Sequence, residues 1–315
     1  MLKLRDEKFD LLYEKGVTKD GRVEFCDIDE TKKISIMSDS MFHTMIYNEN
    51  RIKYAARLIS FFVDVSYERL LKHLRLQKSD FDKKLDKEKN ERGDFVAEFN
   101  GTSIGIEVNN NDSLDTMERN MEYAHREYAK KVSRFDKGTY CYKQIIQLNI
   151  NNFSFKDKEE IFDTYVLRDK VGTVMSDKII FIQIYIPNLI KKWYSSGVEQ
   201  LSEIEKFLLV LTESDIKTSY DLGGDIEYMN EYIKDASDAS RDEELLESYD
   251  KEWALKDQGR REGFEEGQAS GISIGEEKGA LNKSIEVAKK LKQNGIDINI
   301  ISDCTGLSIE EINKL

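Results

Sequence analysis

The sequence predicts an α/β fold in which a mixed sheet is flanked by helices and followed by an all-helical C-terminal extension. Short apolar runs typical of strands occupy residues 94–109, 142–153, 163–169 and 178–187. A helical pattern separates the first of these runs from the second, and every segment after residue 198 has helical periodicity. The order strand, strand, helix, strand is typical of an α/β sheet with mixed pairing.

The composition bounds the size of the fold and its compartment. The 315 residues, of which 39% are apolar and 35% charged, are enough for one α/β domain of about 180–200 residues plus an appended segment. Cys26, Cys141 and Cys304 form no CxxC pair, so we expect no disulfide framework and a reducing, cytoplasmic environment. The chain has neither an apolar leader at its start nor a run of apolar residues long enough to span a membrane, so we expect no membrane association.

Charge and motif content exclude some classes of function and leave others open. Residues 225–266 hold fifteen Asp and Glu against six Lys and Arg, so most of the net charge of -13 lies in one helical segment. The acidity therefore does not exclude nucleic acid as a partner for the rest of the chain. The three histidines lie in unrelated contexts and no GxxxxGK[ST] motif occurs, so the sequence predicts neither a zinc site nor nucleoside triphosphate hydrolysis.

The segment from about Leu114 to Phe135 has the clearest helical pattern in the chain. Apolar residues at helical spacing form one side, which we expect to be buried: Leu114, Met117, Met121, Ala124, Tyr128, Val132 and Phe135. The basic residues of the opposite side are Arg119, Arg126, Lys130 and Arg134. Two interpretations stay open for this basic side, a solvated helix face and a contact with the phosphate backbone of DNA.

Residues 93–111, GDFVAEFNGTSIGIEVNNN, predict a β-hairpin that turns at Asn100 and Gly101. Asp94 begins the first strand and Glu107 ends the second, so two carboxylates lie on adjacent strands that are about 4.8 Å apart. Such a pair can hold Mg²⁺ or Mn²⁺, which lowers the pKa of its bound water and neutralises charge that develops during phosphodiester hydrolysis. Acidic residues at strand ends are more often simply solvated, so the hairpin alone is a weak signal.

The hairpin and the segments after it resemble the degenerate PD-(D/E)xK signature of the Rpn family of recombination-promoting nucleases and transposase-related proteins. The motif residues are Arg92-Gly93-Asp94-Phe95-Val96 and Ile106-Glu107-Val108-Asn109. The pieces KGTY (137–140), IIQLNINNF (145–153), YVLRD (165–169) and FIQIYIPNL (181–189) follow in the family's order, as do the glycine-spaced tail and the closing GLSIEEINKL. The likeness covers about residues 38–315, and this ordered combination is more specific than the core motif.

The resemblance implies roles for individual residues of the hairpin. Asp94 and Glu107 would be metal ligands, and the carbonyl of Val108 would complete the site. Asn109 takes the position where the wider superfamily has a lysine that orients and activates the attacking water as a cation or a base. A neutral amide can hydrogen-bond that water but does not replace the charge. Because the family commonly has an amide here, Asn109 does not by itself imply inactivity.

Two further roles stay open under the resemblance. A functional lysine can also stand on the next helix, at Lys130 or Lys131. An acidic residue on the preceding helix, Asp39 or Glu49, can add a ligand.

The resemblance implies a PD-(D/E)xK, restriction-endonuclease-like fold and a metal-dependent endonuclease that hydrolyses phosphodiester bonds of double-stranded DNA with Mg²⁺ or Mn²⁺. The alternative is a catalytically inactive descendant that binds DNA or protein through its C-terminal helical tail. The expected parts of the chain are an N-terminal segment without an assigned role (1–38), a nuclease core (39–198), an acidic helical region (199–258) and a tail (259–315).

That tail begins with six glycines, one at every fourth residue from Gly259 to Gly279. Each costs a helix about 1 kcal/mol relative to alanine, so helix propensity does not account for them. A spacing of four leaves a slowly wrapping groove that a second helix can approach closely, and we expect a homo-oligomer through this segment. The alternative is a loosely helical spacer. Further on, Thr305-Gly306-Leu307-Ser308 resembles the turn of a helix-turn-helix, although its near-neutral charge gives weak support for DNA binding.

Overall fold

The computed structural model describes residues 17–18, 20–77, 95–111, 115–130, 133–134, 140–141, 144–155 and 158–315. The chain divides into two compact units, Met1–Glu252 (unit 1) and Trp253–Leu315 (unit 2). Across these described ranges, no helix combines the length and the apolar character that crossing a membrane requires.

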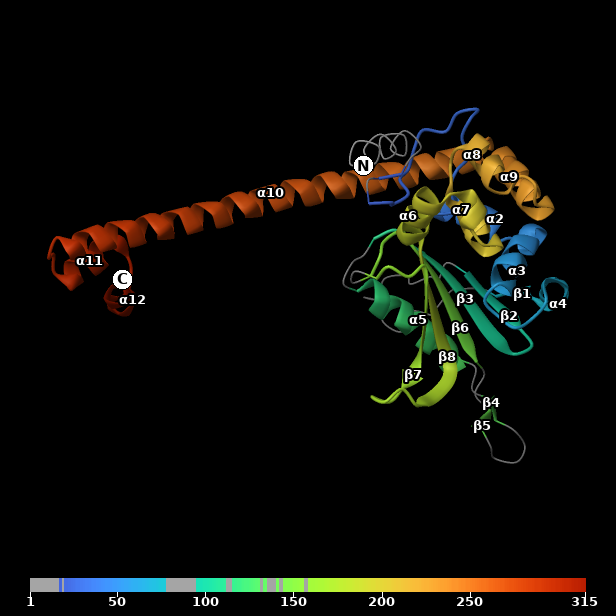
Figure 1. Cartoon of the computed structure of the whole chain (residues 1–315), viewed down its shortest axis with the longest axis horizontal. Coiled ribbons are helices and arrows are strands. Elements are labelled where there is room, and N and C mark those ends of the chain that lie inside the picture. Colours follow the sequence, from blue (N-terminus) through green and yellow to red (C-terminus); the bar gives the residue numbers. More distant parts are fainter. Residues whose placement is uncertain are drawn as a thin grey trace. The chain divides into compact units, whose positions relative to one another are not determined.

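Unit 1 is built on a mixed six-stranded sheet (Figure 1). In spatial order the strands are β1 (Arg75–Leu76), β2 (Phe95–Phe99), β3 (Thr102–Asn109), β6 (Ile145–Asn151), β8 (Val174–Tyr185) and β7 (Phe162–Arg168). Strands β3, β6 and β8 run parallel, whereas β1–β2, β2–β3 and β7–β8 are antiparallel pairs. A separate small ribbon pairs β4 (Ser133–Arg134) with β5 (Tyr140–Cys141). The order and directions of the strands confirm the predicted mixed α/β sheet.

The β2–β3 hairpin turns where the sequence predicts. Asn100 (φ 48°) and Gly101 (φ 84°) both have positive φ, which a two-residue type I′ turn requires and which Asn and Gly tolerate best. The parallel neighbour β6 then lies beside β3 with Glu107 opposite Asn149. The carboxyl ends of β3, β6 and β8 therefore meet at one edge of the sheet.

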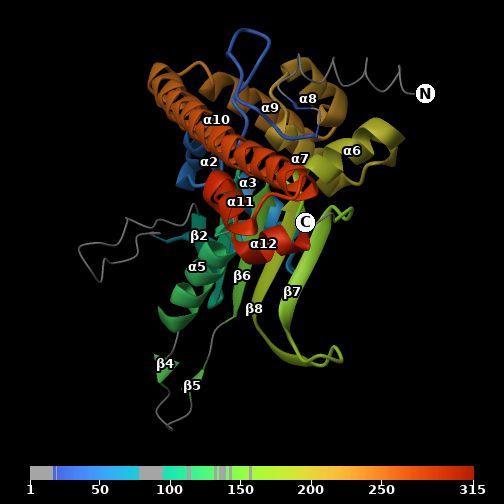
Figure 2. The same ribbon diagram turned by 90° about the vertical axis from the view of Figure 1, so that its left-hand side faces the viewer.

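The two faces of the sheet differ in chemistry, because side chains alternate along each strand. One face carries buried apolar residues: Ile104, Ile106, Val108, Ile146, Leu148, Ile150, Ile182 and Ile184. The rings of Phe62 and Phe162 are in contact on this side, so the segment after α3 (Ile52–Ser60) helps to cover it. The opposite face carries Glu107, Asn109, Gln147, Asn149, Asn151 and Gln183, all buried. Helix α5 (Thr116–Lys130) lies along this polar face (Figures 1 and 2).

The other helices of unit 1 precede the hairpin or follow the last strand of the sheet in the chain. They are α2 (Asp39–Met45), η1 (Glu49–Arg51), α3, α4 (Tyr67–His73), α6 (Ile186–Ser196), η2 (Val198–Gln200), α7 (Glu203–Thr212), α8 (Ile216–Gly223), α9 (Glu227–Ala239) and the start of α10 (Glu243–Gln293). The segment before α2 is part of the same packing, since the backbone N–H of Ile36 donates to the carbonyl of Leu211 at 3.1 Å.

Helix α5 differs from its prediction in length and in the side that it buries. It ends at Lys130, and Arg134 lies in strand β4 instead of on the helix. The predicted apolar side is partly open, with Met121 47% exposed, whereas Asn120 and Glu127 are 1% and 7% exposed. The physical reason is that α5 packs on the polar face of the sheet, so polar side chains are buried between helix and sheet.

Strand β8 also differs from its prediction. It begins at Val174, four residues before the predicted run 178–187, and the exposed residues Val174 and Met175 lie in this added part. Within the predicted run, Ile179, Ile180 and Phe181 are half-buried and the strand is buried from Ile182 to its end. Pro187 does not end the strand but stands in the first turn of α6, where its missing N–H has no partner to lose.

Unit 2 is helical throughout its length, as predicted. Helix α10 continues through all six glycines, and α11 (Ile298–Thr305) and α12 (Ile309–Lys314) follow it. Gly306 has φ 72° and allows the tight turn between the last two helices. Ala288, Ile301, Leu307 and Ile312 form a small buried core, which α10, α11, α12 and the turn at Gly306 share.

Candidate functional site

The polar end of β3 holds the residues that the sequence singled out. Glu107, Val108 and Asn109 are its last residues, and they are 4%, 8% and 2% exposed. Asp94 lies outside the described residues, which resume at Phe95, the partner of Ile106. The structure therefore places one of the two predicted carboxylates and leaves the pair untested.

Asn109 is held by side chains from two directions. Its Nδ2 donates to Oδ1 of Asn151 at 3.0 Å, and its Oδ1 accepts a hydrogen bond from the guanidinium of Arg119 at 3.2 Å. Asn151 extends this row of hydrogen bonds to the next strand, because its Nδ2 donates to Oε1 of Gln183 at 2.9 Å. These bonds fix the orientation of the amide, for which the resemblance implies the lysine position of the wider superfamily, and they place Arg119 beside it.

A second row of amides follows along β6. Gln147 donates to Oδ1 of Asn149 at 3.4 Å, and Asn149 stands opposite both Glu107 and Gln183 in the strand pairing. Gly105 makes room for this row, since a Cβ there would lie 2.1 Å from Oε1 of Gln147. We call Asn109, Gln147, Asn149, Asn151 and Gln183 the amide ladder.

The start of α2 lies at the same edge of the sheet. Nδ2 of Asn110 donates to the carbonyl of Met37 at 2.7 Å, two residues before Asp39 in the first turn of α2. The Asp39 backbone N–H donates to Oε1 of Glu252 at 3.2 Å. Glu49 is an exposed residue of η1. Asp39 is exposed as well, and the described hydrogen bond ties Met37, two residues before it, to the end of β3.

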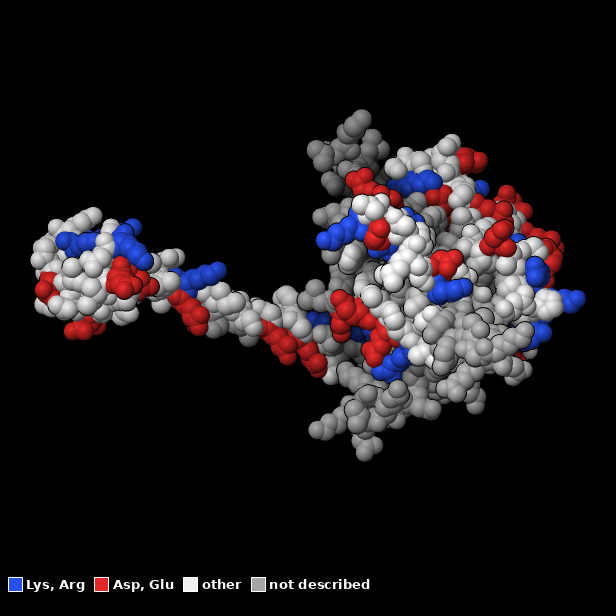
Figure 3. Space-filling model, turned by 90° about the horizontal axis from the view of Figure 1, so that it is seen from below, with Lys and Arg blue, Asp and Glu red and all other residues white. Residues whose placement is uncertain are grey.

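The four predicted basic residues do not form one continuous stripe. Arg119 contacts Asn109, whereas the guanidinium of Arg126 is engaged with the Glu122 carboxylate at 2.6 and 3.0 Å. The side chain of Lys130 lies outside the described part, and Arg134 belongs to β4. On the face seen in Figure 3, the described Lys and Arg lie in small groups among acidic and uncharged residues.

The donor set at this edge can be compared with the needs of a divalent metal. Within the described ranges, no three His, Cys, Asp or Glu side chains come together as a metal-binding group. Glu107 and the carbonyl of Val108 offer oxygen atoms, which are the ligands that Mg²⁺ and Mn²⁺ prefer. The residues fit such an ion if a further carboxylate joins them, which is the role that the resemblance implies for Asp94.

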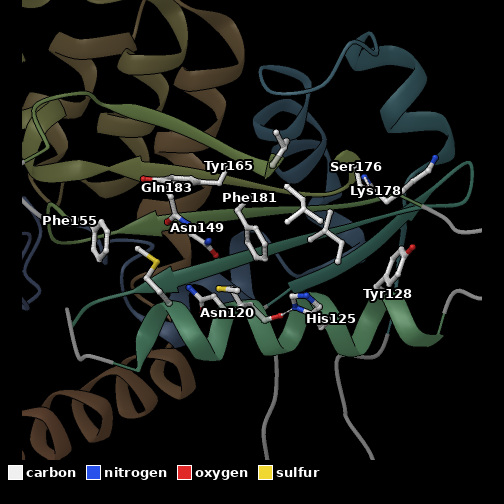
Figure 4. A pocket seen from close by; sticks show the side chains of 15 residues that line it. Asn120, His125, Tyr128, Asn149, Phe155, Tyr165, Ser176, Lys178, Phe181 and Gln183 are labelled. Carbon is white, nitrogen blue, oxygen red and sulfur yellow. Dashed lines mark hydrogen bonds between the residues drawn. The ribbon is translucent and has the colours of Figure 1, made fainter. Parts of the chain in front are cut away.

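Sequence reasoning missed the amide ladder and a pocket beside it. A cavity of about 590 Å³ lies between α5 and the strands β7 and β8, and Asn120, Asn149 and Gln183 line it together with apolar residues (Figure 4). A signal was available, because Gln147, Asn149 and Asn151 alternate with Ile and Leu along IIQLNIN. That pattern predicts a strand with one amide-rich face.

A mixed sheet with three central parallel strands, a helix along its polar face and a buried carboxylate after a hairpin defines an α/β protein of the PD-(D/E)xK, restriction-endonuclease-like class. The family model of the PD-(D/E)XK nuclease family transposases matches residues 36–259, and the chain belongs to that family. This match confirms the family and the fold that the sequence predicts. Neither the comparison with curated proteins nor that with solved structures finds a match.

Proposed function

We propose that the protein is a metal-dependent endonuclease that hydrolyses phosphodiester bonds of double-stranded DNA in the cytoplasm. The observation that supports this most is the position of Glu107, a buried carboxylate near the end of the central strand β3 in a member of a nuclease family. The proposed nuclease core is residues 39–198, flanked by the N-terminal segment (1–38), the acidic helical region (199–258) and the tail (259–315).

Glu107, Asp94 and the carbonyl of Val108 would hold the ion, Mg²⁺ or Mn²⁺. When bound, the ion would lower the pKa of a water and neutralise negative charge on the phosphate. Asn109, fixed by Asn151 and Arg119, would orient the attacking water by hydrogen bonding. Arg119 would supply the positive charge that an amide lacks.

DNA would reach this edge through phosphate contacts. We propose Arg119, Arg126, Lys130 and Arg134 as the contacting residues. For Arg126, contact requires that its ion pair with Glu122 opens, and such an exposed pair is worth only about 0.3–0.5 kcal/mol.

The second candidate function is binding without cleavage, through the C-terminal tail. The observation that favours it is Asn109 itself, an uncharged side chain whose oxygen and nitrogen both already have protein partners.

For either function we propose a homo-oligomer. Helix α10 is continuous through the six glycines, and a Cβ added at any of them would meet no atom within 4 Å.

Plasmid nicking with full-length protein tests the proposed activity. We expect Mg²⁺- or Mn²⁺-dependent nicking that EDTA abolishes and that Glu107→Gln and Asp94→Asn each slow by about 100-fold or more. Glu98→Gln is the matched control, because Glu98 is a carboxylate of the same hairpin whose partner is Gln77, at 2.6 Å. Nicking that survives both substitutions, or that no metal supports, would overturn the enzymatic proposal in favour of the second candidate.

A further inference from the structure

The pocket beside the amide ladder has two chemically distinct ends. Figure 4 shows Asn120, Asn149, Gln183 and Phe155 at one end, with Phe181 in the middle. Ser176, Lys178 and Tyr128 lie at the other end. Its volume of about 590 Å³ lies within the usual range of small-molecule sites.

Two buried amides in the wall of the pocket lack partners. Asn120 is 1% exposed, and neither its Nδ2 nor its Oδ1 has a hydrogen-bond partner among the described residues. Asn149 is fully buried, and its Nδ2 is likewise unpaired. Buried polar atoms are normally paired, and an unpaired one destabilises the fold. Two such side chains, one from α5 and one from β6, face the same cavity and together offer two donor groups and one acceptor.

We infer that this pocket binds one unpaired nucleobase of the nucleic acid that the nuclease site engages. A base has flat apolar faces and an edge of alternating donors and acceptors. Phe155, Phe181 and the methionines Met117 and Met121 can contact its faces, and the amide of Asn120 can pair with its edge. A purely apolar ligand would leave the amides unpaired, so it does not fit the chemistry of this wall.

The position of the pocket connects it to the proposed cleavage site. Asn149 stands directly opposite Glu107 on the neighbouring strand, and adjacent strands are about 4.8 Å apart. A base held at Asn149 would therefore bring its own phosphates to the polar edge of the sheet. The inference rests on the proposed function, because that function is what makes nucleic acid the source of the base. The binding of the base itself needs no metal.

Access to the amides requires a small movement, because the unpaired atoms have almost no surface open to solvent. Met117 and Met121 line the same pocket, and Met121 is 47% exposed. Methionine side chains are unbranched and adapt to a ligand more readily than branched ones. A base can thus reach Asn120 by displacing flexible side chains while the backbone stays in place.

The test measures binding in EDTA by fluorescence anisotropy, so that no cleavage intervenes. One labelled single strand carries normal bases and a second of the same length carries abasic residues throughout. We expect the full-length protein to bind the first about tenfold or more tightly than the second. Asn149→Leu and Asn120→Leu should each remove most of this difference. Asn230→Leu, at an exposed asparagine of α9 that is paired with the carbonyl of Gly224, should preserve it.

Stability gives an independent measurement of the same variants. Because neither polar atom of the Asn120 amide is paired without a ligand, Asn120→Leu should melt at the wild-type temperature or above it, whereas Asn149→Leu also loses the bond that its Oδ1 accepts from Gln147. A purely structural role for these amides would instead lower the melting temperature and leave base-dependent binding unchanged, and that result would overturn the inference. Equal affinity of the wild type for both strands, or no binding to either, would also overturn it.

A duplex arm distinguishes the two sources of the base. A duplex carrying 2-aminopurine brightens if the protein extrudes the base, whereas unchanged fluorescence together with base-dependent binding to single strands assigns the site to an already unpaired base. The inference and the proposed nuclease fail separately. Cleavage without base-dependent binding would overturn only the proposal that the pocket binds a base. Base-dependent binding without cleavage would overturn only the proposed nuclease activity.

Discussion

Arg119 stands one hydrogen bond from the position that lysine occupies in the wider PD-(D/E)xK superfamily. Its guanidinium donates to Oδ1 of Asn109 at 3.2 Å, so under the proposed function the amide and the cation together would supply what a single lysine supplies elsewhere. An arginine is charged at every working pH and offers fixed donors for a phosphate. In the proposed nuclease, this pair would make a neutral residue at position 109 compatible with catalysis.

If Arg119 stabilises the transition state, Arg119→Ala should lower kcat by about 100-fold with a small change in KM, and Arg119→Lys should restore part of the rate. Steady-state cleavage of a defined duplex measures both constants. Arg241→Ala is the control, because Arg241 is an exposed arginine outside the proposed DNA contacts and its guanidinium donates to the carbonyl of Glu30 at 3.0 Å. The alternative is that Arg119 only contacts DNA. In that case Arg119→Ala would leave kcat unchanged and raise KM, and the slope of log binding constant against log salt concentration would fall by about the value of one phosphate contact.

Lys33 is a buried cation far along the chain from these residues. It is fully buried, and its Nζ donates to the carbonyls of Val210, at 2.8 Å, and of Glu213. Burial lowers the pKa of Lys33 from 10.5 to about 8, although the negative charge of Glu213 opposes the shift. Between these two values the unfolded chain binds a proton that the folded protein does not bind. The contribution of Lys33 to the free energy of unfolding is therefore complete above pH 10.5, and it is lost as the pH falls through about 8.

We accordingly expect the free energy of unfolding to rise between about pH 8 and pH 9.5 by an amount of order 1–2 kcal/mol that Lys33→Met does not show. Urea unfolding at several pH values measures the two slopes, and only the difference between them is informative. The range stops below the ordinary tyrosine pKa of 10.0, because burial raises the pKa of Tyr54 and of Tyr232 and their ionisation would oppose the rise. Equal slopes in both proteins would contradict the assignment to Lys33.

At the scale of elements, strands β3 and β6 pack closely because β3 has a glycine, Gly105, opposite Gln147 of β6. Gly105 allows the carboxamide of Gln147 to lie across β3, since a Cβ would come within 2.1 Å of its Oε1. Gln147 is 4% exposed and donates to Asn149, so it has little freedom to move away. The amide ladder and the pairing of these strands are thus parts of one packing arrangement.

Gly105→Ala should therefore destabilise the protein by about 1–3 kcal/mol through overpacking. Combining it with Gln147→Ala removes the clash, and the double variant should be more stable than the sum of the two single effects predicts, by about 1 kcal/mol. Chemical denaturation of the four proteins of this cycle gives the coupling. Strict additivity would show that Gln147 finds another rotamer at no cost and that the two strands are not coupled through it.

The elements themselves were largely predictable, because their signals are local. Asn100 and Gly101 predict the hairpin turn, and alternating or apolar runs predict β3, β6 and β8. The buried side of α5 was predicted only in part, since Ala124 is buried but Met121 is open and Asn120 and Glu127 are buried instead. Hydrophobic periodicity assumes an apolar partner. The partner of α5 is the amide ladder, which comes together only through the parallel crossovers between β3, β6 and β8. Asn120 could not be assigned to a buried site from its own neighbours in sequence.

At the scale of the whole molecule, the acidic segment 225–266 crosses the boundary between the units after Glu252, and eleven of its fifteen acidic residues belong to unit 1. Most of the acidic excess lies in residues 225–266, and the sheet side of unit 1 shows interspersed charges on the face of Figure 3. Unit 2 instead has a small apolar core and a glycine-spaced helix with exposed apolar residues, among them Phe264 and Ile272, at 71% and 57%. Exposed apolar side chains next to open glycine positions are typical of surfaces that pack against another chain.

The six glycines of α10 allow that packing to be tested by substitution. Each glycine of α10 has open space where a Cβ would stand, so alanine fits at all six positions and should strengthen the isolated helix by about 1 kcal/mol per site. In a helix pair that relies on close approach, alanine is still small, whereas leucine holds the helices apart.

We expect light scattering to give the wild type a multiple of the chain mass of 36.7 kDa, and we expect Gly267→Ala/Gly271→Ala to keep that mass. Gly267→Leu/Gly271→Leu should fall to 36.7 kDa while its helix content by circular dichroism stays at the wild-type level. A wild type that already has the single-chain mass, or a leucine variant that keeps the larger one, would favour the spacer over the interface.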